Sequence, residues 1–87
     1  MQLSIDEQQL FLKAKAVIDS YRIYYGVIMK DLRFENGLYV VYVSIPKLNR
    51  APSSKIAAKL KDELNEVLKQ LGVDTEHFYF KVKYKTE

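Results

Sequence analysis

The chain has 87 residues and no cysteine, with 48% hydrophobic and 29% charged residues and a formal net charge of +3. This length allows one domain and is too short for two, and the composition excludes a disordered tail. The lack of cysteine excludes disulfides, thiolate metal sites and thiol nucleophiles. The longest apolar run, residues 38–43, is too short for a membrane span. Because no secretory signal is visible at the N-terminus, we expect a cytoplasmic protein.

The first segment predicts an amphipathic helix. Ser4 and Glu7 have the spacing of a capping box, in which each satisfies a free backbone N–H group. Apolar residues then recur at helical spacing: Leu10, Phe11, Ala14, Val17, Ile18 and Tyr21. We therefore expect a helix from about Ile5 to about Ser20.

The next two segments predict a β-hairpin. Residues 23–29 are β-branched, aromatic or flexible apolar residues, interrupted only by Gly26, and are expected to form the first strand. Asn36-Gly37 is a strong signal for a tight turn, because both residues tolerate a positive φ. Residues 38–45 are expected to form the second strand, which ends before Pro46.

A second helix and a third strand complete the chain. Ser53 or Ser54 is expected to cap the helix and Gly72 to end it. The third strand is expected from about His77 to about Lys85, because apolar and polar residues alternate there. The apolar positions of the helix are Ile56, Leu60, Leu64, Val67, Leu68 and Leu71.

These elements predict an α+β fold, a single α-β-β-α-β domain over residues 1–87. Two amphipathic helices are expected to pack mainly on one face of a three-stranded sheet. Two strand orders remain open: 2-1-3 would be fully antiparallel, and 1-2-3 would pair the second and third strands in parallel. The expected core residues include Leu10, Phe11, Val17, Ile18, Val27, Val40, Leu60, Leu64, Val67, Phe78 and Phe80.

Residues 47–61 form a basic segment with five cations and no acid. The N-terminus of a helix presents free N–H groups and a partial positive charge, which suit a phosphate. This segment therefore predicts an anion or nucleic-acid site, against the alternative of a solvated loop with ordinary surface lysines. The candidate residues are Lys47, Arg50, Ser53, Ser54, Lys55 and Lys59.

The third strand offers a second candidate surface. If Phe78, Phe80 and Val82 point to the helices, the residues between them project from the opposite face. A sheet face with aromatic rings among cations can stack bases and neutralise phosphates, as in single-strand binders. The alternative is that edge-strand lysines discourage aggregation. The candidate residues are Tyr79, Lys81, Lys83 and Lys85.

The second strand is apolar on both faces, which suggests an interface. With both helices on one face of the sheet, the other apolar set would be exposed, and monomers seldom expose such a patch. Either the helices lie on opposite faces, or the open face meets another chain. Tyr39, Val41 and Val43 are therefore expected to form the interface of a homodimer.

Catalytic and metal-binding patterns are lacking. His77 is the only histidine, which excludes a two-histidine metal motif. Glu63 and Glu66 are three residues apart, but Lys59 and Lys69 flank them, so an ion-pair face is expected rather than a pair of catalytic acids. The sequence has no phosphate loop, nucleophile elbow or dinucleotide fingerprint. We expect no enzymatic activity, no metal, no cofactor and no membrane partner.

The order of elements over residues 27–84 resembles the cytoplasmic domain of cation diffusion facilitators, with Asp31-Leu32-Arg33 before a turn, a capped helix and a final strand. The metal-binding histidines of that family are missing, so the resemblance implies no metal role here. The order is also similar to type II K-homology-like domains, which bind RNA through a Gly-x-x-Gly loop that is absent from this chain.

The sequence as a whole predicts a non-catalytic binding domain. The basic segment and the Tyr/Lys strand favour nucleic acid as the partner. The alternative is a homo-oligomeric protein-interaction module that uses the open sheet face.

Overall fold

The computed structural model describes residues 7–47 and 49–87. It contains two helices and three strands in the order α1 (Glu7–Tyr25), β1 (Ile28–Glu35), β2 (Leu38–Ile45), α2 (Ser53–Gln70) and β3 (Phe80–Thr86). This order confirms the predicted α-β-β-α-β fold. The expected capping box at Ser4 lies outside the described residues.

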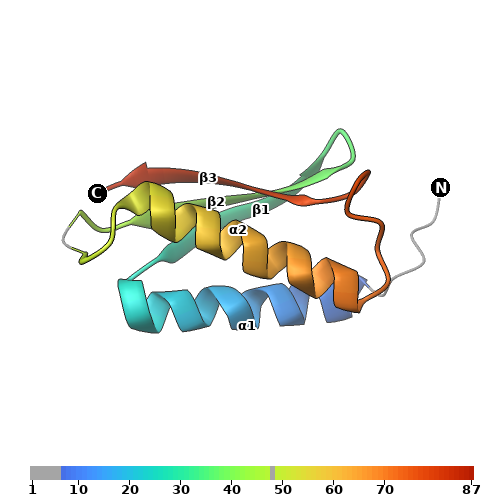
Figure 1. The fold of residues 1–87 in the computed structure, drawn as a ribbon, viewed down its shortest axis with the longest axis horizontal. Helices are drawn as coiled ribbons and strands as arrows, with labels where there is room; N and C mark the ends of the chain where they lie inside the picture. Colours follow the sequence, from blue (N-terminus) through green and yellow to red (C-terminus); the bar gives the residue numbers. More distant parts are fainter. Residues whose placement is uncertain (1–6, 48) are drawn as a thin grey trace.

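The sheet has the mixed strand order β1-β2-β3. β1 pairs antiparallel with β2, and β2 pairs in parallel with β3. A parallel pair requires a crossover connection, and the 18 residues of α2 provide it. Both helices lie on the same side of the sheet, so the molecule has a helical layer and a sheet layer (Figure 1). The other face of the sheet carries no helix, and we call it the open face.

The first helix is longer than expected. Ile23–Tyr25 belong to α1 rather than to the first strand, so the prediction of strand from Ile23 was wrong. Tyr21 is buried, and its ring packs against that of Tyr25 with centroids 5.5 Å apart. This packing favours one more turn of helix, which Gly26 ends with a φ of +71°.

Two further glycines lie where the sequence predicted them, in the turn after β1 and at the end of α2. Asn36 and Gly37 have φ of 51° and 81°, as in the tight turns that join antiparallel strands. Gly72 has φ of 81°, and the N–H groups of Gly72 and Val73 donate to the carbonyls of Lys69 and Leu68, both at 3.0 Å. This pattern is a Schellman motif at the end of α2.

The core lies between the helices and the sheet. Leu60, Leu64 and Phe80 are fully buried there, as the sequence predicted, together with Leu10, Ile18, Val27 and Val67. Val17 and Phe78 are only partly buried against this cluster. Phe11 is 44% exposed, so its assignment to the core was wrong. Val40 is buried, but on the open face, as described below.

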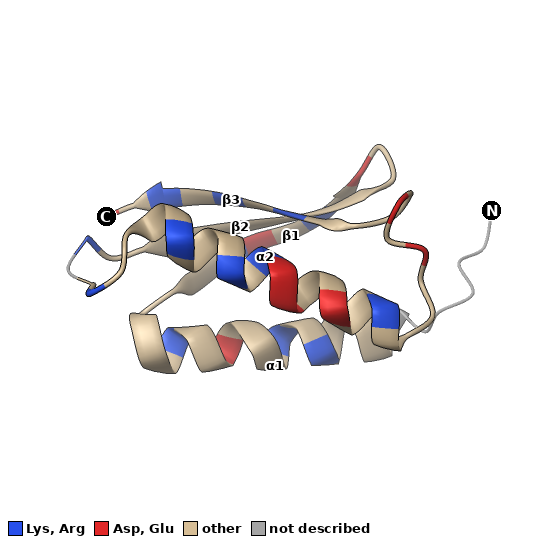
Figure 2. Cartoon of the chain, in the orientation of Figure 1, with Lys and Arg blue, Asp and Glu red and all other residues tan. Residues whose placement is uncertain are grey.

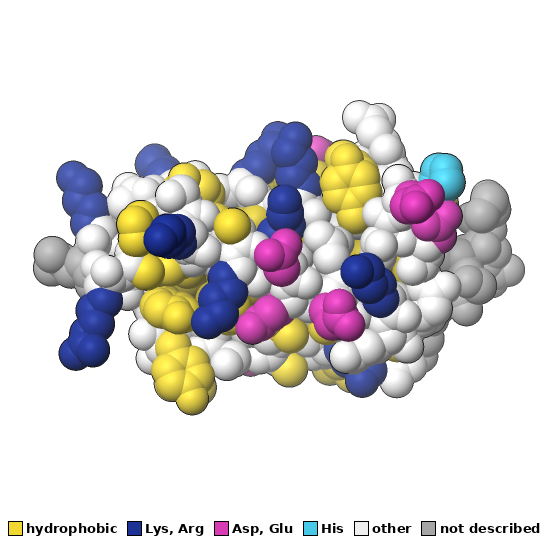
Figure 3. Space-filling view, in the orientation of Figure 1, with side chains coloured by type: hydrophobic (Ala, Val, Ile, Leu, Met, Phe, Trp, Pro, Cys, Tyr) yellow, Lys and Arg dark blue, Asp and Glu magenta, His cyan; other side chains and the backbone are white. Residues whose placement is uncertain are grey.

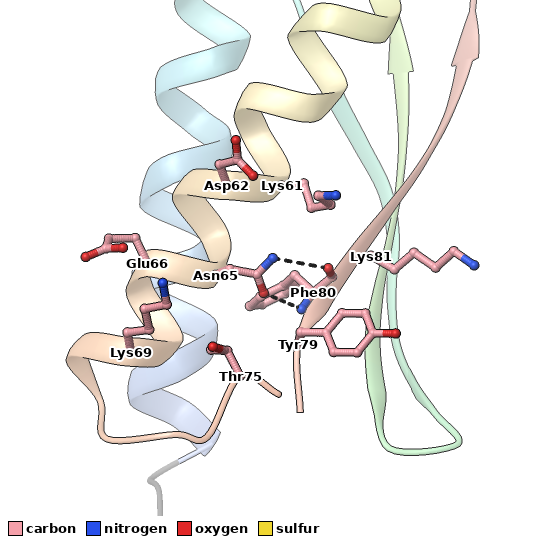
Figure 4. Close-up of a pocket in the computed structure, with 9 residues that line it drawn as sticks. All are labelled: Lys61, Asp62, Asn65, Glu66, Lys69, Thr75, Tyr79, Phe80 and Lys81. Carbon is pink, nitrogen blue, oxygen red and sulfur yellow. Dashed lines mark hydrogen bonds between the residues drawn. The ribbon is translucent and has the colours of Figure 1, made fainter. Parts of the chain in front are cut away.

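The third strand begins at Phe80 rather than at His77. The Asn65 side chain of α2 fixes this start: its Oδ1 accepts the Phe80 N–H at 2.7 Å, and its Nδ2 donates to the Phe80 carbonyl at 3.4 Å. Figure 4 shows the Asn65 amide facing the Phe80 backbone across the gap between α2 and β3. Residues 74–77 form a turn before this strand.

Candidate nucleic-acid interface

The start of α2 is not capped as the sequence suggested. Pro52 occupies the cap position with extended backbone, no side chain caps the helix, and no acidic residue lies in its first turn. Ser53 and Ser54 are the first two residues of the helix, so the prediction that one of them caps it was wrong. The first N–H groups of a helix have no intrahelical partner, and Lys55 is exposed beside them.

Asn49 holds the loop that carries Lys47 and Arg50. Its Nδ2 donates to the carbonyl of Tyr25, the last residue of α1, at 3.0 Å and to the carbonyl of Pro46 at 2.9 Å. The loop is therefore tied to the end of α1 and to the residue that follows β2, while the side chains of Lys47 and Arg50 remain exposed.

The same loop is joined to the end of β3. The N–H of Glu87 donates to the carbonyl of Ile45 at 2.9 Å, and the N–H of Lys47 donates to the carbonyl of Glu87 at 2.5 Å. These bonds continue the parallel ladder beyond Ile45 and Thr86, the last register partners, so that Lys85 lies near the loop. Two basic segments that are far apart in sequence thus meet at one end of the molecule. We call Lys47, Arg50, Lys55, Lys59 and Lys85 the basic end.

Charges are distributed unevenly along the molecule. Figure 2 shows basic positions in the loop before α2, in the first turns of α2 and along β3, and acidic positions in the middle of α2, on β1 and in the turns at the other end. In the same view α1 carries positions of both signs, and the last turn of α2 carries a basic one. Figure 3 shows the same separation on the surface. Residues 46–61 and 80–87 together carry eight cations and one acid, Glu87, so positive charge is concentrated at the basic end and along β3.

The alternation predicted for β3 is present. Phe80 is buried and Val82 is half-buried against the core, whereas Lys81, Lys83 and Lys85 are exposed. These three lysines, which we call the lysine row, therefore project from the open face. Figure 4 shows the side chains of Tyr79 and Lys81 directed away from α2, and Tyr79 is 38% exposed.

The predicted interface residues of β2 point the other way. Tyr39, Val41 and Val43 are buried in the core beneath the helices, because they share the face on which Phe80 packs. Their assignment to the open face was wrong. Self-association stays a prediction, but these three side chains are not at the surface.

The open face is covered by charged side chains rather than left apolar. Its β2 residues alternate with the core set, and Val40 and Ser44 among them are buried. Tyr42 is half-buried, with the Arg33 Cζ 5.2 Å and the Lys83 Nζ 5.7 Å from its ring centroid. Long basic side chains can cover apolar surface with their stems while the charge stays in water.

Sequence reasoning missed the charged cluster on β1. Asp31, Arg33 and Glu35 lie at alternate positions and so share the open face. The Arg33 Nε donates to the Asp31 Oδ2 at 2.6 Å, and its Nη1 lies 3.6 Å from the Glu35 Oε1. The hydrogen bond from Arg33, and then that from the Leu32 N–H, lower the pKa of Asp31. The alternate spacing of these three charged residues in the sequence was the signal from which the cluster could have been predicted.

Exposed apolar side chains lie on α1 and also on the two edge strands, where Ile28, Phe34 and Tyr84 are 49%, 53% and 43% exposed. Leu12, Ile23 and Tyr24 are 58%, 72% and 77% exposed. Because residues 23–25 were expected to form a strand, their exposure on the surface of α1 was not predicted.

His77, Glu63 and Glu66 are the remaining residues that the sequence analysis considered. The Nδ1 of His77 lies 2.7 Å from the Asp74 Oδ2, both side chains are exposed, and this contact lowers the pKa of Asp74. Glu63 lies beside buried Tyr21, where burial first and then the Glu63 charge raise the pKa of the tyrosine. No ion pair joins Glu63 or Glu66 to a lysine among the described residues. Within residues 7–47 and 49–87, no group of three or more possible ligands is placed to hold a metal ion.

An open groove of about 650 Å³ runs between α2 and β3. Its wall carries Lys61, Lys69 and Lys81 together with Asp62 and Glu66, so the acids offset most of the positive charge. The Asn65 amide in the same wall is already bonded to the Phe80 backbone. The groove therefore differs from the basic end, which has five cations in segments that are nearly free of acids.

No protein-family model, curated protein or solved structure matches this chain. In the part of the chain that the structure describes, neither helix is long and apolar enough to cross a membrane.

Proposed function

We propose that this chain binds a single-stranded nucleic acid at the basic end and along the lysine row. The observation that carries the proposal is the meeting of two basic segments, residues 47–59 and 81–85, through the backbone bonds of Lys47 and Glu87. A concentration of cations with almost no acid attracts a polyanion and makes its binding dependent on salt.

A single strand fits the open face better than a duplex does. Tyr42 and Tyr79 lie among the cations of this face, and aromatic rings beside a basic track are the usual means of binding unpaired bases. The lysine row follows one β-strand, which offers a line of charge to one phosphate backbone.

The test measures the binding of fluorescently labelled single-stranded RNA and DNA by anisotropy over a range of salt. Two variants remove the two parts of the surface: Lys47→Glu, Arg50→Glu and Lys55→Glu in one, and Lys81→Glu, Lys83→Glu and Lys85→Glu in the other. Each lost phosphate contact lowers the magnitude of the salt slope by about 0.7, so each variant is expected to lose about 2. All six side chains are exposed, so far-UV circular dichroism should be unchanged.

The matched control is Lys13→Glu, Lys15→Glu and Lys69→Glu, which changes the net charge equally at exposed positions outside the basic end. This control should keep most of the affinity. If it weakens binding as much as the other two variants do, net charge alone accounts for the interaction. If the native chain binds neither RNA nor DNA at ~20 mM salt, where screening is weak, the proposal is wrong.

A further inference from the structure

The open face is divided by charge across the width of the sheet. On the β3 side lies the lysine row, which contains no acid. On the β1 side lie Asp31, Arg33 and Glu35, and the Tyr42 ring of β2 lies between the two sides. A phosphate is attracted to the first side and repelled by the carboxylates of the second. A bound strand would therefore place its backbone over β3 and its bases over β2 and β1.

Arg33 is held in place over this second side. Its Nε is bonded to the Asp31 Oδ2 at 2.6 Å, and Asp31 is itself fixed by the Leu32 N–H, which donates to its Oδ1 at 2.9 Å. The Arg33 Cζ lies 5.2 Å from the Tyr42 ring centroid. The side chain is nevertheless 58% exposed, so its guanidinium is both positioned and accessible.

This cluster has the chemistry of a site for a base. Unpaired bases stack on guanidinium planes and on aromatic rings. A carboxylate accepts hydrogen bonds from the amino group of cytosine, and each carboxylate oxygen has more than one lone pair. Asp31 and Glu35 are 43% and 39% exposed beside Arg33. Uracil has a carbonyl oxygen at the position of that amino group, and a carboxylate repels it.

We infer that Arg33 and Tyr42 form a stacking site for one base, and that Asp31 and Glu35 make this site prefer a base with an exocyclic amino group over uracil. The inference rests on the proposed function, because the phosphates of the same strand are bound by the lysine row. To the proposed function the inference adds the orientation of the bound nucleic-acid strand on the sheet and the class of base that the site accepts.

The experiment compares oligocytidine and oligouridine RNAs of about ten nucleotides, a length within the usual site size of a small binding domain. The native chain is expected to bind oligocytidine about tenfold more tightly, within the usual range for one specific base contact. Arg33→Lys keeps the charge but removes the planar group, and Asp31→Asn removes the negative charge and replaces one of the two acceptor oxygens with a donor. Both are expected to bring the affinity ratio close to one.

The matched control is Lys81→Gln, which removes a cation from the lysine row. It is expected to weaken both oligonucleotides equally and to leave the ratio unchanged. A native chain that binds both RNAs with equal affinity overturns the inference and leaves the proposed function standing. A ratio that survives in both Arg33→Lys and Asp31→Asn also overturns it. Failure to bind either RNA overturns the proposed function itself.

Discussion

Asn65 is the residue that joins the helical layer to the edge strand of the sheet. Its amide bonds both backbone groups of Phe80, and Phe80 is fully buried. An edge strand has one row of backbone groups that no neighbouring strand satisfies. Asn65 satisfies the first pair of them, and in doing so it sets the position along α2 at which β3 begins.

Replacing Asn65 should therefore cost stability. Asn65→Ala leaves the Phe80 N–H and carbonyl without these partners, and we expect a loss of about 1–3 kcal/mol in the free energy of unfolding, measured by urea denaturation. Asn65→Asp keeps the acceptor for the Phe80 N–H and loses only the donor, so its loss should be smaller. If Asn65→Ala is as stable as the native chain, the amide does not anchor β3.

Arg33 determines the ionisation of its neighbour Asp31. Its hydrogen bond is the largest cause of the lowered pKa of Asp31. Arg33→Gln should therefore raise the pKa of Asp31 towards its usual range, as measured by carboxyl carbon NMR shifts over a pH titration. Asp74 is an internal control, because its pKa is lowered by His77 and should not change. An Asp31 pKa that stays low in the variant would show that the Leu32 N–H alone is sufficient.

The lowered pKa of Asp31 also determines how the contribution of this residue to stability changes with pH. A carboxyl whose pKa is lower in the folded state stabilises that state above its unfolded pKa. The contribution is lost as the pH falls through the lowered value. Because the Asp31 and Arg33 side chains are largely exposed, the effect on overall stability should be small.

The boundary between α1 and β1 depends on Gly26. Its φ is +71°, and a Cβ added there would lie 3.0 Å from the Pro46 Cγ. Pro46 follows β2, so Gly26 allows the end of α1 to approach the end of the central strand. Gly37 has a φ of +81°, and an added Cβ would meet nothing within 4 Å. Both glycines therefore have a left-handed backbone, but only at Gly26 would an added Cβ meet a neighbouring side chain.

This difference predicts unequal effects of the same substitution. Gly37→Ala should cost about 1–2 kcal/mol, the price of a left-handed backbone for a residue with a Cβ. Gly26→Ala should cost more, because Pro46 must also move. Thermal and urea unfolding of both variants measure the difference. Equal losses of stability in the two variants would show that Pro46 can move without an energetic cost.

The elements were largely predictable from the sequence, and their boundaries and faces were less so. Periodicity and the glycine turns identify both helices, β2 and β3, whereas the first strand was expected at residues 23–29 and lies at Ile28–Glu35. Local β-propensity made Ile23–Tyr25 look like strand, because the packing of Tyr21 on Tyr25 is a tertiary contact. The face of β2 could not be assigned because both of its faces are apolar, so a period of two does not show which set meets the helices.

The candidate site was predictable only in its parts. The basic segment and the lysines of β3 could be recognised from composition and alternation. Their meeting at one end depends on the parallel pairing of β2 with β3, and the sequence left the strand order open. The alternate spacing of Asp31, Arg33 and Glu35 was a local signal, but the contact of Arg33 with Tyr42 depends on the register between β1 and β2, which no local pattern indicates.

At the scale of the whole molecule, one core includes side chains from both helices and from β2 and β3. No element has a separate core on which it could remain folded when the rest unfolds. We therefore expect a single cooperative transition, as is usual for domains of this size. Far-UV circular dichroism and tyrosine fluorescence should give coincident urea curves. Separate midpoints would show that α1, which packs mainly on α2, unfolds on its own.

The separation of cations and acids along the molecule has a kinetic consequence. The molecule is 42 Å long and about 20 Å across, and its basic end lies opposite its acidic turns (Figure 2). Such a distribution is an electric dipole along the long axis, which turns the protein in the field of a polyanion before contact. Diffusional encounters would then occur mostly with the basic end forward. The association rate, more than the dissociation rate, would fall as ionic strength rises.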